Sequence, residues 1–285
     1  APIYTIRYPK TTMKKNAVIP ILKGTIIGAS MLVPGLSGGT MAIILGIYDD
    51  IIRAVSRFGE KKKENTLFLT KVGVGGLLGI LLLAKLLLNA VSMFRMPMLF
   101  LFLGAISGSI PMLIKKAGIS RFHPVQILYF AAGLGIVLGL SALPKNWINF
   151  SETGGFGFFI LILAGLLVAV ALVLPGISAS YMLLVLGLYE ITLSAVGRLD
   201  LLFLAPLFIG LSAGILLTTR LLETAMSRFP AATYLTICGF VVGSVQEVFP
   251  GFPNGWDIPF CVIGLFIGFF CVFFLSKTQK HWETK

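Results

Sequence analysis

The chain has 285 residues, of which 57% are hydrophobic and only 12% are charged. A soluble domain carries about a quarter charged residues, so this composition excludes an ordinary soluble protein. The formal net charge is +12. The basic residues cluster between apolar segments, which favours membrane topology and anionic lipid over nucleic acid as their explanation. Apolar runs of about twenty residues recur along the chain and predict an all-α polytopic membrane protein.

The N-terminal segment is treated separately from the fold. The chain begins with Ala1, and Met13 resembles a natural start. We therefore expect residues 1–12 to be an added leader, within a tail that covers residues 1–15.

One motif occurs twice in the chain. The stretch "VPGLSGGTMAIILGIYDDIIRAVSR" (33–57) aligns with "LPGISASYMLLVLGLYEITLSAVGR" (174–198) at one fixed offset. Further on, "KLLLNAVSMF" (85–94) aligns with "RLLETAMSRF" (220–229). Unrelated apolar helices would not share Pro-Gly and Gly-x-Tyr-acid motifs in the same order. The sequence therefore predicts an internal duplication.

Each repeat is expected to consist of a broken, re-entrant helix hairpin followed by three transmembrane helices. As a helix, 18–33 would be about 24 Å long, shorter than a hydrocarbon core of about 30 Å, which favours re-entry. The segment 155–174 is longer, and a full crossing stays open for it. The expected elements are, in repeat 16–150, the hairpin 18–57 (18–33 and 37–57) and helices 66–91, 97–116 and 122–144; in repeat 151–276, the hairpin 155–198 (155–174 and 178–198) and helices 200–223, 230–249 and 257–276; then a cytoplasmic tail, 277–285.

Positive charge predicts the orientation. Most of the 23 lysines and arginines lie in the N-terminal segment, in 53–63, 115–121 and 220–228, and in the C-terminal tail. If both hairpins re-enter, all of these lie on one side, which the positive-inside rule makes cytoplasmic together with both termini. Each repeat then crosses an odd number of times, so the two repeats have inverted topology, as in many secondary transporters. Two full crossings per hairpin would give the same parity.

The hairpins break at Pro34-Gly35 and Pro175-Gly176, which are expected to approach each other near the membrane midplane. Irregular backbone at that depth must be covered by protein or water. A new helix starts after each break, and its first N–H groups favour an anion, most simply a phosphate. A helix break with a serine cap is the simpler alternative. The predicted phosphate-binding residues are Ser37, Gly38, Gly39, Thr40, Ser178, Ala179, Ser180, Tyr181, Lys85 and Arg220.

Three acids are candidates for coupling or gating. Asp49 and Glu190 follow Gly-x-Tyr at matching positions of the two repeats, and Glu223 lies one turn beyond Arg220. Ionisable residues at membrane depth are costly and mark functional sites, which favours a role for Asp49 and Glu190 as proton carriers. The alternative is that both lie near the interface and pair with a base such as Arg53.

The remaining features are assigned to packing or left open. Lys85, if it does not bind phosphate, would snorkel towards the outer surface, and the role of Glu247 is open. No metal or other cofactor is expected. Two glycine pairs have the spacing of close helix contacts: Gly75/Gly79 and Gly104/Gly108. Three cysteines lack metal-ligand spacing and are expected to be small buried hydrophobes: Cys238, Cys261 and Cys271.

The stretch "GASMLVPGLSGGTMAIILGIYDDII" resembles the signature of the bacterial PopT-type polyprenyl-phosphate transporters, formerly a family of unknown function. The resemblance covers residues 16–276. It implies a flippase, not an enzyme, that moves undecaprenyl phosphate from the outer to the inner leaflet of the bacterial cytoplasmic (inner) membrane. That step recycles the lipid carrier of peptidoglycan precursors. The implied partners are this anionic lipid and the bilayer, with no nucleic acid; a homo-oligomer stays open.

Two other functions stay open. Undecaprenyl-diphosphate phosphatases carry a Pro-Gly-x-Ser-Arg-Ser motif, to which "LPGISASY" is similar. Ala179 takes the place of that arginine, as Gly38 does in the first copy, so a phosphoryl transition state would lack its main cation. A carrier of a small soluble anion is the other alternative.

Overall fold

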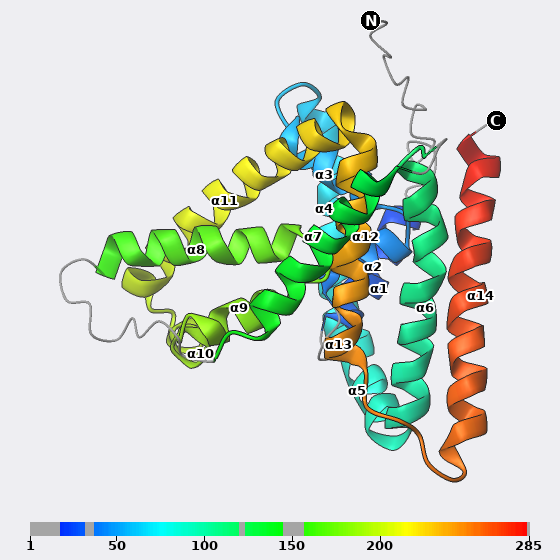
Figure 1. The fold of residues 1–285 in the computed structure, drawn as a ribbon. Coiled ribbons are helices and arrows are strands. Elements are labelled where there is room, and N and C mark those ends of the chain that lie inside the picture. Colours follow the sequence, from blue (N-terminus) through cyan, green and yellow to red (C-terminus); the bar gives the residue numbers. More distant parts are fainter. Residues whose placement is uncertain (1–17, 32–36, 120–122, 145–156, 284–285) are drawn as a thin grey trace, which may run out of the picture.

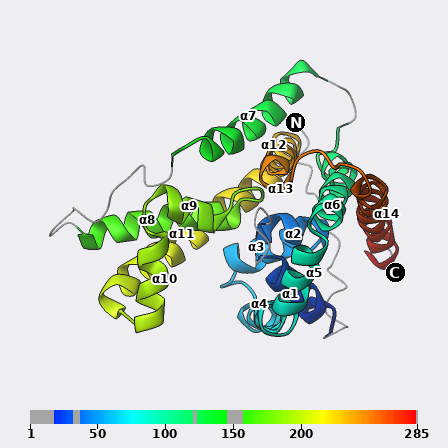
Figure 2. The same cartoon turned by 90° about the horizontal axis from the view of Figure 1, so that it is seen from below.

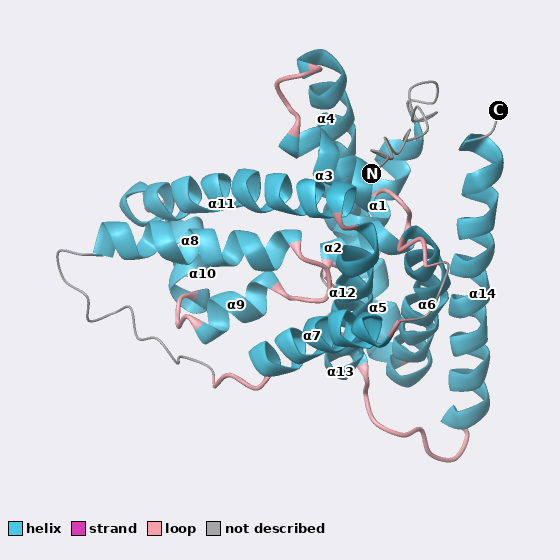
Figure 3. Ribbon diagram, turned by 45° about the horizontal axis from the view of Figure 1, so that its top comes forward, coloured by secondary structure: helices cyan, strands magenta, loops and turns pink. Residues whose placement is uncertain are grey.

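The computed structural model describes residues 18–31, 37–119, 123–144 and 157–283, and the statements below concern these residues. The predicted tail 1–15 and the first break, Pro34-Gly35, lie outside them. Every regular element in the described part is a helix (Figure 3). The all-helical class expected from the composition is therefore confirmed.

The helices have the following bounds. They are α1 (Val18–Ser30), α2 (Gly38–Ile44), α3 (Tyr48–Ser56), α4 (Lys62–Leu78), the π-helix η2 (Gly79–Leu83), α5 (Ala84–Met93), α6 (Arg95–Lys116), α7 (Pro124–Ser141), α8 (Gly157–Val173), α9 (Ala179–Val185), α10 (Tyr189–Arg198), α11 (Leu201–Arg228), α12 (Pro230–Gly243), α13 (Val245–Val248) and α14 (Asp257–Glu283).

Six helical segments are long and apolar enough to cross a membrane: Lys62–Leu83, Arg95–Lys116, Pro124–Ser141, Leu201–Arg228, Pro230–Val248 and Asp257–Ser276. Each of them overlaps one of the six transmembrane helices expected from the sequence. The apolar helices α1 and α8 have 13 and 17 residues. Their lengths, about 20 and 26 Å, fall short of a hydrocarbon core of about 30 Å.

The expectation of single helices over 37–57 and 178–198 is wrong. Each segment forms two short helices, α2 and α3 or α9 and α10, and the second pair is bent by 110°. The glycine at each bend, Gly46 or Gly187, has a positive φ of 63° or 69°. The N–H of the following residue donates to the carbonyl five residues back, at 2.9 Å in both copies. This is the Schellman cap, in which a glycine ends a helix.

Other bounds differ from expectation as well. The π-helix η2 interrupts the expected helix 66–91, and the expected helix 230–249 is divided into α12 and α13. Helix α14 continues to Glu283, through most of the expected tail at 277–285. Two of the three cysteines are buried as expected, whereas Cys271 is exposed. An exposed cysteine on α14 is compatible with a helix face turned towards lipid.

Two packed helix pairs lie at opposite sides of the molecule (Figure 1): α8 with α11, and α6 with α14. Helices α7 and α12 pack on each other and lie between these pairs in the view of Figure 1, while Figure 2 shows α7 along one edge of the molecule. The spans α6 and α12 are the most buried, while α4, α7 and α14 are mostly exposed. Ile106 of α6 and Val241 of α12 are fully buried. The short helix α2 contacts α6 and α8, which places the start of the first broken segment at the centre.

Glycines make matching contacts in the two halves of the chain. A Cβ on Gly104 of α6 would collide with the carbonyl oxygen of Leu265 in α14. A Cβ on its repeat-mate Gly239 of α12 would collide with the carbonyl oxygen of Phe130 in α7. Leu265 and Phe130 are themselves repeat-mates. The last helix of each half therefore packs against the other half.

The close approach of α6 and α14 gives a first prediction. Gly104→Ala is expected to lower the free energy of unfolding by about 1–3 kcal/mol, because a backbone carbonyl cannot yield without separating the two helices. Gly139→Ala in α7 is the matched control, since no atom lies within 4 Å of its added Cβ. Thermal unfolding in detergent is expected to show a lower midpoint for the first variant alone. Equal midpoints would refute the packing argument.

Candidate functional site

The two broken segments meet in a hydrogen-bonded centre. The Ser37 Oγ caps α2 by accepting from the N–H of Thr40 at 3.1 Å, and it lies 2.8 Å from the Thr40 hydroxyl. The N–H of Gly176, in the second break, donates to Ser37 Oγ at 3.1 Å and to Thr40 Oγ1 at 3.0 Å. A Cβ on Gly39 would lie 3.1 Å from the Cα of Pro175. We call these five residues the break centre.

Neighbouring helices hold the break centre in place. Gly176 has a φ of 81°, and an added Cβ would collide with the carbonyl oxygen of Phe240 in α12. The buried Tyr48 hydroxyl, at the start of α3, donates to the Val173 carbonyl at the end of α8, at 2.9 Å. Since the last carbonyls of a helix have no partner within it, this bond satisfies one of them. The second break is therefore fixed by α3 and by α12.

The first turn of α9 faces a different neighbour. Ser178 caps α9 by accepting from the N–H of Tyr181 at 3.3 Å. The Tyr181 hydroxyl donates to the carbonyls of Ser141 and Leu143 at the end of α7, at 3.0 and 2.9 Å. The structure thus brings Ser37 and Thr40 to Gly176, while the Tyr181 hydroxyl bonds to α7.

The other predicted phosphate ligands are not part of these hydrogen bonds. Gly38 and Ala179 are half-buried, and Ser180 is exposed. Lys85 is the second residue of α5, directly after the π-helix, and its side chain lies outside the described part. Within that part, no group of three or more His, Cys, Asp and Glu side chains could hold a metal ion.

Asp49 lies in an ionic contact between three helices. Its Oδ2 accepts from Lys116 Nζ, in the last turn of α6, at 2.7 Å. The Tyr234 hydroxyl of α12 donates to the same oxygen at 2.9 Å. The Asp49 and Lys116 side chains are 20% and 31% exposed. The sequence suggested a nearby base such as Arg53; the partners found lie 67 and 185 positions away.

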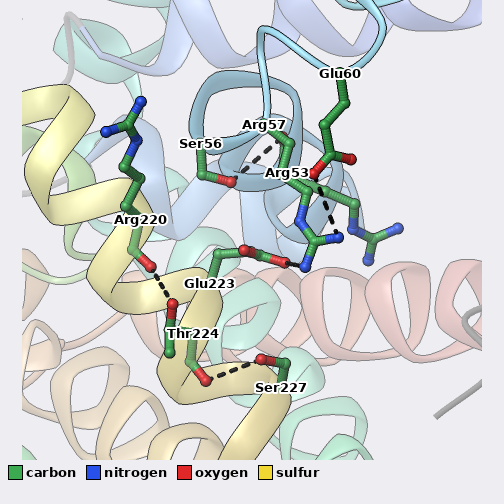
Figure 4. A network of polar contacts seen from close by, with 8 residues as sticks. All are labelled: Arg53, Ser56, Arg57, Glu60, Arg220, Glu223, Thr224 and Ser227. Atoms are coloured by element: carbon green, nitrogen blue, oxygen red, sulfur yellow. Dashed lines mark hydrogen bonds and ion pairs between the residues drawn. The ribbon is translucent and has the colours of Figure 1, made fainter. Parts of the chain in front are cut away.

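Glu223 of α11 pairs with Arg57, which follows α3, at 2.6 Å (Figure 4). The Glu223 side chain is 17% exposed and that of Arg57 is 46% exposed. Arg220 is exposed, and its side chain extends away from Glu223 (Figure 4). The structure therefore connects Glu223 to Arg57 at the end of α3, and Arg220 is not part of this ion pair.

The other two acids lie apart from this cluster. Glu190 is exposed on α10, and the described residues offer its carboxylate no hydrogen bond or ion pair. Glu247, whose role the sequence left open, accepts a hydrogen bond from the Ser141 hydroxyl at 3.2 Å. Since Ser141 also receives the Tyr181 hydroxyl, α7, α9 and α13 meet there.

Four contact residues were missed by the sequence analysis. The repeated Gly-x-Tyr motif was a usable signal for Tyr48, because a tyrosine kept in an apolar segment needs a partner for its hydroxyl. No local pattern connects the others to the acids they bind. They are Arg57, Lys116 and Tyr234.

Comparison with known proteins identifies the family. A family model described as undecaprenyl phosphate translocase-like matches residues 27–255. A polyprenyl-phosphate transporter of Staphylococcus aureus is 33% identical over 269 residues, 90% of this chain and 94% of that protein. One of Vibrio cholerae is 28% identical over 249 residues, 82% of this chain and 78% of that protein. No solved structure matches. The chain thus belongs to the undecaprenyl phosphate translocase-like family.

Proposed function

We propose that this protein transports polyprenyl phosphate, and specifically that it flips undecaprenyl phosphate from the outer to the inner leaflet of the bacterial cytoplasmic membrane. Family membership, the names of both relatives and the six candidate spans support a membrane transporter of this substrate class, which is not an enzyme. The observation that carries the proposal is the break centre. Two interrupted helices meet there in hydrogen bonds inside an otherwise apolar molecule.

The proposed architecture is a pair of inverted repeats. Helices α1 and α8 are shorter than a straight crossing requires, so each enters the membrane and returns through the broken segment that follows. Three candidate spans follow each hairpin, and an odd number of crossings inverts the second repeat relative to the first. The matching glycine contacts of the two halves support this relation. Both termini then lie in the cytoplasm, where the positive-inside rule places the basic segments.

In this mechanism the lipid phosphate enters between the two breaks. The Gly176 N–H and the hydroxyls of Ser37 and Thr40, which now bind one another, turn to the phosphate oxygens. Hydrogen bonds to a charged oxygen are about twice as strong as neutral ones, which offsets the loss of the contacts in the break centre. Ser178 and Ser180 add hydroxyls from the second break. The polyprenyl tail stays among lipids while one half rocks against the other.

We further propose that protonation couples this step to the proton gradient. Asp49 and Glu190 occupy matching positions in the two halves, so in an inverted arrangement they lie towards opposite faces. A carboxylate that gains a proton loses its attraction for a cation. For Asp49 that cation is Lys116.

The test is a translocation assay in proteoliposomes. Labelled undecaprenyl phosphate is placed in one leaflet and its arrival in the other is followed, for the wild type and for Ser37→Ala/Ser178→Ala. Loss of both helix caps and of two phosphate donors is expected to slow translocation about tenfold or more, the effect of roughly 1.4 kcal/mol. Ser92→Ala is the control, because the hydroxyl of this exposed serine on α5 donates to the Asn89 carbonyl of its own helix.

The same proteoliposomes, given other substrates, distinguish this function from the two alternatives. Release of phosphate from undecaprenyl diphosphate by the wild type would make the protein a phosphatase. Movement of inorganic phosphate, without movement of the lipid, would make it a carrier of a soluble anion. If Ser37→Ala/Ser178→Ala translocated the lipid as fast as the wild type, the phosphate site would not lie at the two breaks.

A further inference from the structure

Two ion pairs join α3 to other helices. Asp49, in the first turn of α3, reaches Lys116 of α6, and Arg57, directly after α3, reaches Glu223 of α11. Tyr234 of α12 donates to the Asp49 carboxylate as well. This nine-residue helix is thereby tied to elements of both halves. The Asp49–Lys116 pair lies within the first half, whereas the contacts with Glu223 and Tyr234 join the first half to the second.

The ion pair of Asp49 occurs in one half of the chain only. Residues that pack the helices repeat from half to half, as Gly104 and Gly239 do. The position that matches Lys116 holds Gly251, and the position that matches Tyr234 holds Leu99. Packing therefore does not require this pair, because the second half packs in the same way without it. A charged contact found in one repeat acts at one face of the membrane.

The local chemistry suits an exchange of partners. An ammonium group has three donors, and the Lys116 side chain is 31% exposed, so an incoming anion can approach it. A partly exposed ion pair is worth no more than about 1 kcal/mol, so a second anion can compete with Asp49. The Tyr234 hydroxyl bonds to the same Asp49 oxygen. That carboxylate therefore keeps a donor after Lys116 has left it.

We propose that Lys116 is a phosphate-binding residue whose ammonium group pairs with Asp49, itself bonded to Tyr234, while no lipid is bound. The phosphate monoester of the lipid replaces Asp49 as the partner of Lys116 when it reaches the inner leaflet. This inference rests on the proposed function. Lys116 is then a cation of the substrate path that lies outside the two breaks. The Arg57–Glu223 pair, on the far end of α3, keeps the helix attached to α11 during the exchange.

The test is equilibrium binding of labelled undecaprenyl phosphate to the purified protein in detergent. Lys116→Met is expected to raise the Kd about tenfold through loss of the cation. Asp49→Asn is expected to lower the Kd several-fold, because the competing charge is gone while asparagine still accepts from Tyr234. Lys116→Arg is expected to keep wild-type binding within about threefold. Lys115→Met, which alters the neighbouring lysine, is the matched control and is expected to leave the Kd unchanged.

Opposite effects of the two variants are the decisive result. A pair with a purely structural role predicts that Asp49→Asn and Lys116→Met both weaken binding, and that outcome overturns the inference. A gain of affinity in Asp49→Asn cannot come from misfolding. Wild-type protein that binds no undecaprenyl phosphate would refute the proposed function itself. Competition by inorganic phosphate at equal concentration would show that the residue recognises free phosphate and not a lipid headgroup.

Discussion

Gly176→Ala is expected to stop translocation of polyprenyl phosphate and to destabilise the protein by about 2–5 kcal/mol. A residue with a side chain at this positive φ costs roughly 1–3 kcal/mol, and the added Cβ also collides with the Phe240 carbonyl of α12. To relieve the collision, the second break must move away from α12. That movement removes the Gly176 N–H from Ser37 and Thr40. Thermal unfolding and translocation in proteoliposomes measure the two effects.

Gly197→Ala is the matched control for this prediction. Gly197 lies in α10, and nothing lies within 4 Å of its added Cβ. Alanine favours a helix over glycine by about 1 kcal/mol, so the midpoint of the control is expected to stay or to rise. If Gly176→Ala kept wild-type stability and translocation, the break centre would have no role in either.

Asp49→Asn/Glu190→Gln is expected to remove the response of translocation to an imposed pH gradient. One pH unit across the membrane supplies about 1.4 kcal/mol for each coupled proton, enough for a tenfold change in rate. The wild type is expected to speed up when the gradient drives protons in the direction of lipid transport. The double variant is expected to run at one rate with or without the gradient.

The single variants identify the acid that carries the proton. Asp49 faces Lys116 of α6 and Tyr234 of α12, and its neighbour Asp50 lies near Arg53 of α3 and Lys23 of α1. The exposed Glu190 has no such surroundings, so Asp49→Asn is expected to account for most of the loss.

Asp200→Asn is the control for the pH experiment. Asp200 caps α11 by accepting from the N–H groups of Leu202 and Phe203, and asparagine caps a helix equally well. The variant thus removes one acid without removing its hydrogen bonds. A pH response of Asp49→Asn/Glu190→Gln equal to that of the wild type would exclude coupling through either acid.

The transmembrane helices could be predicted from the sequence because the pattern that identifies a span is local. A run of about twenty apolar residues predicts a span wherever it occurs, and all six such runs proved to be helices of sufficient length. The bends within 37–57 and 178–198 were missed for a physical reason. Gly46 and Gly187 stand among apolar residues that also suit a continuous helix, and only the backbone shows their positive φ.

The site was partly readable for the same reason. Ser37 and Ser178 are helix caps in the structure, as their place after a Pro-Gly break predicts. The partners of Asp49 were not predictable, because the sequence around a carboxylate does not indicate which distant side chain will bind it. Lys116 looked like an ordinary member of a basic segment at the end of a span. Its contact depends on how α3, α6 and α12 pack together.

The exchange of last helices between the halves has a consequence for biosynthesis. Helix α6 packs on α14, and α7 packs on α12. On the ribosome, α6 enters the bilayer long before its partner has been made, so the glycine face at Gly104 and Gly108 first borders lipid or a chaperone. Two separately made halves would have to meet as an entwined dimer at a rate set by their concentration. Joining them in one polypeptide makes that encounter intramolecular and independent of expression level.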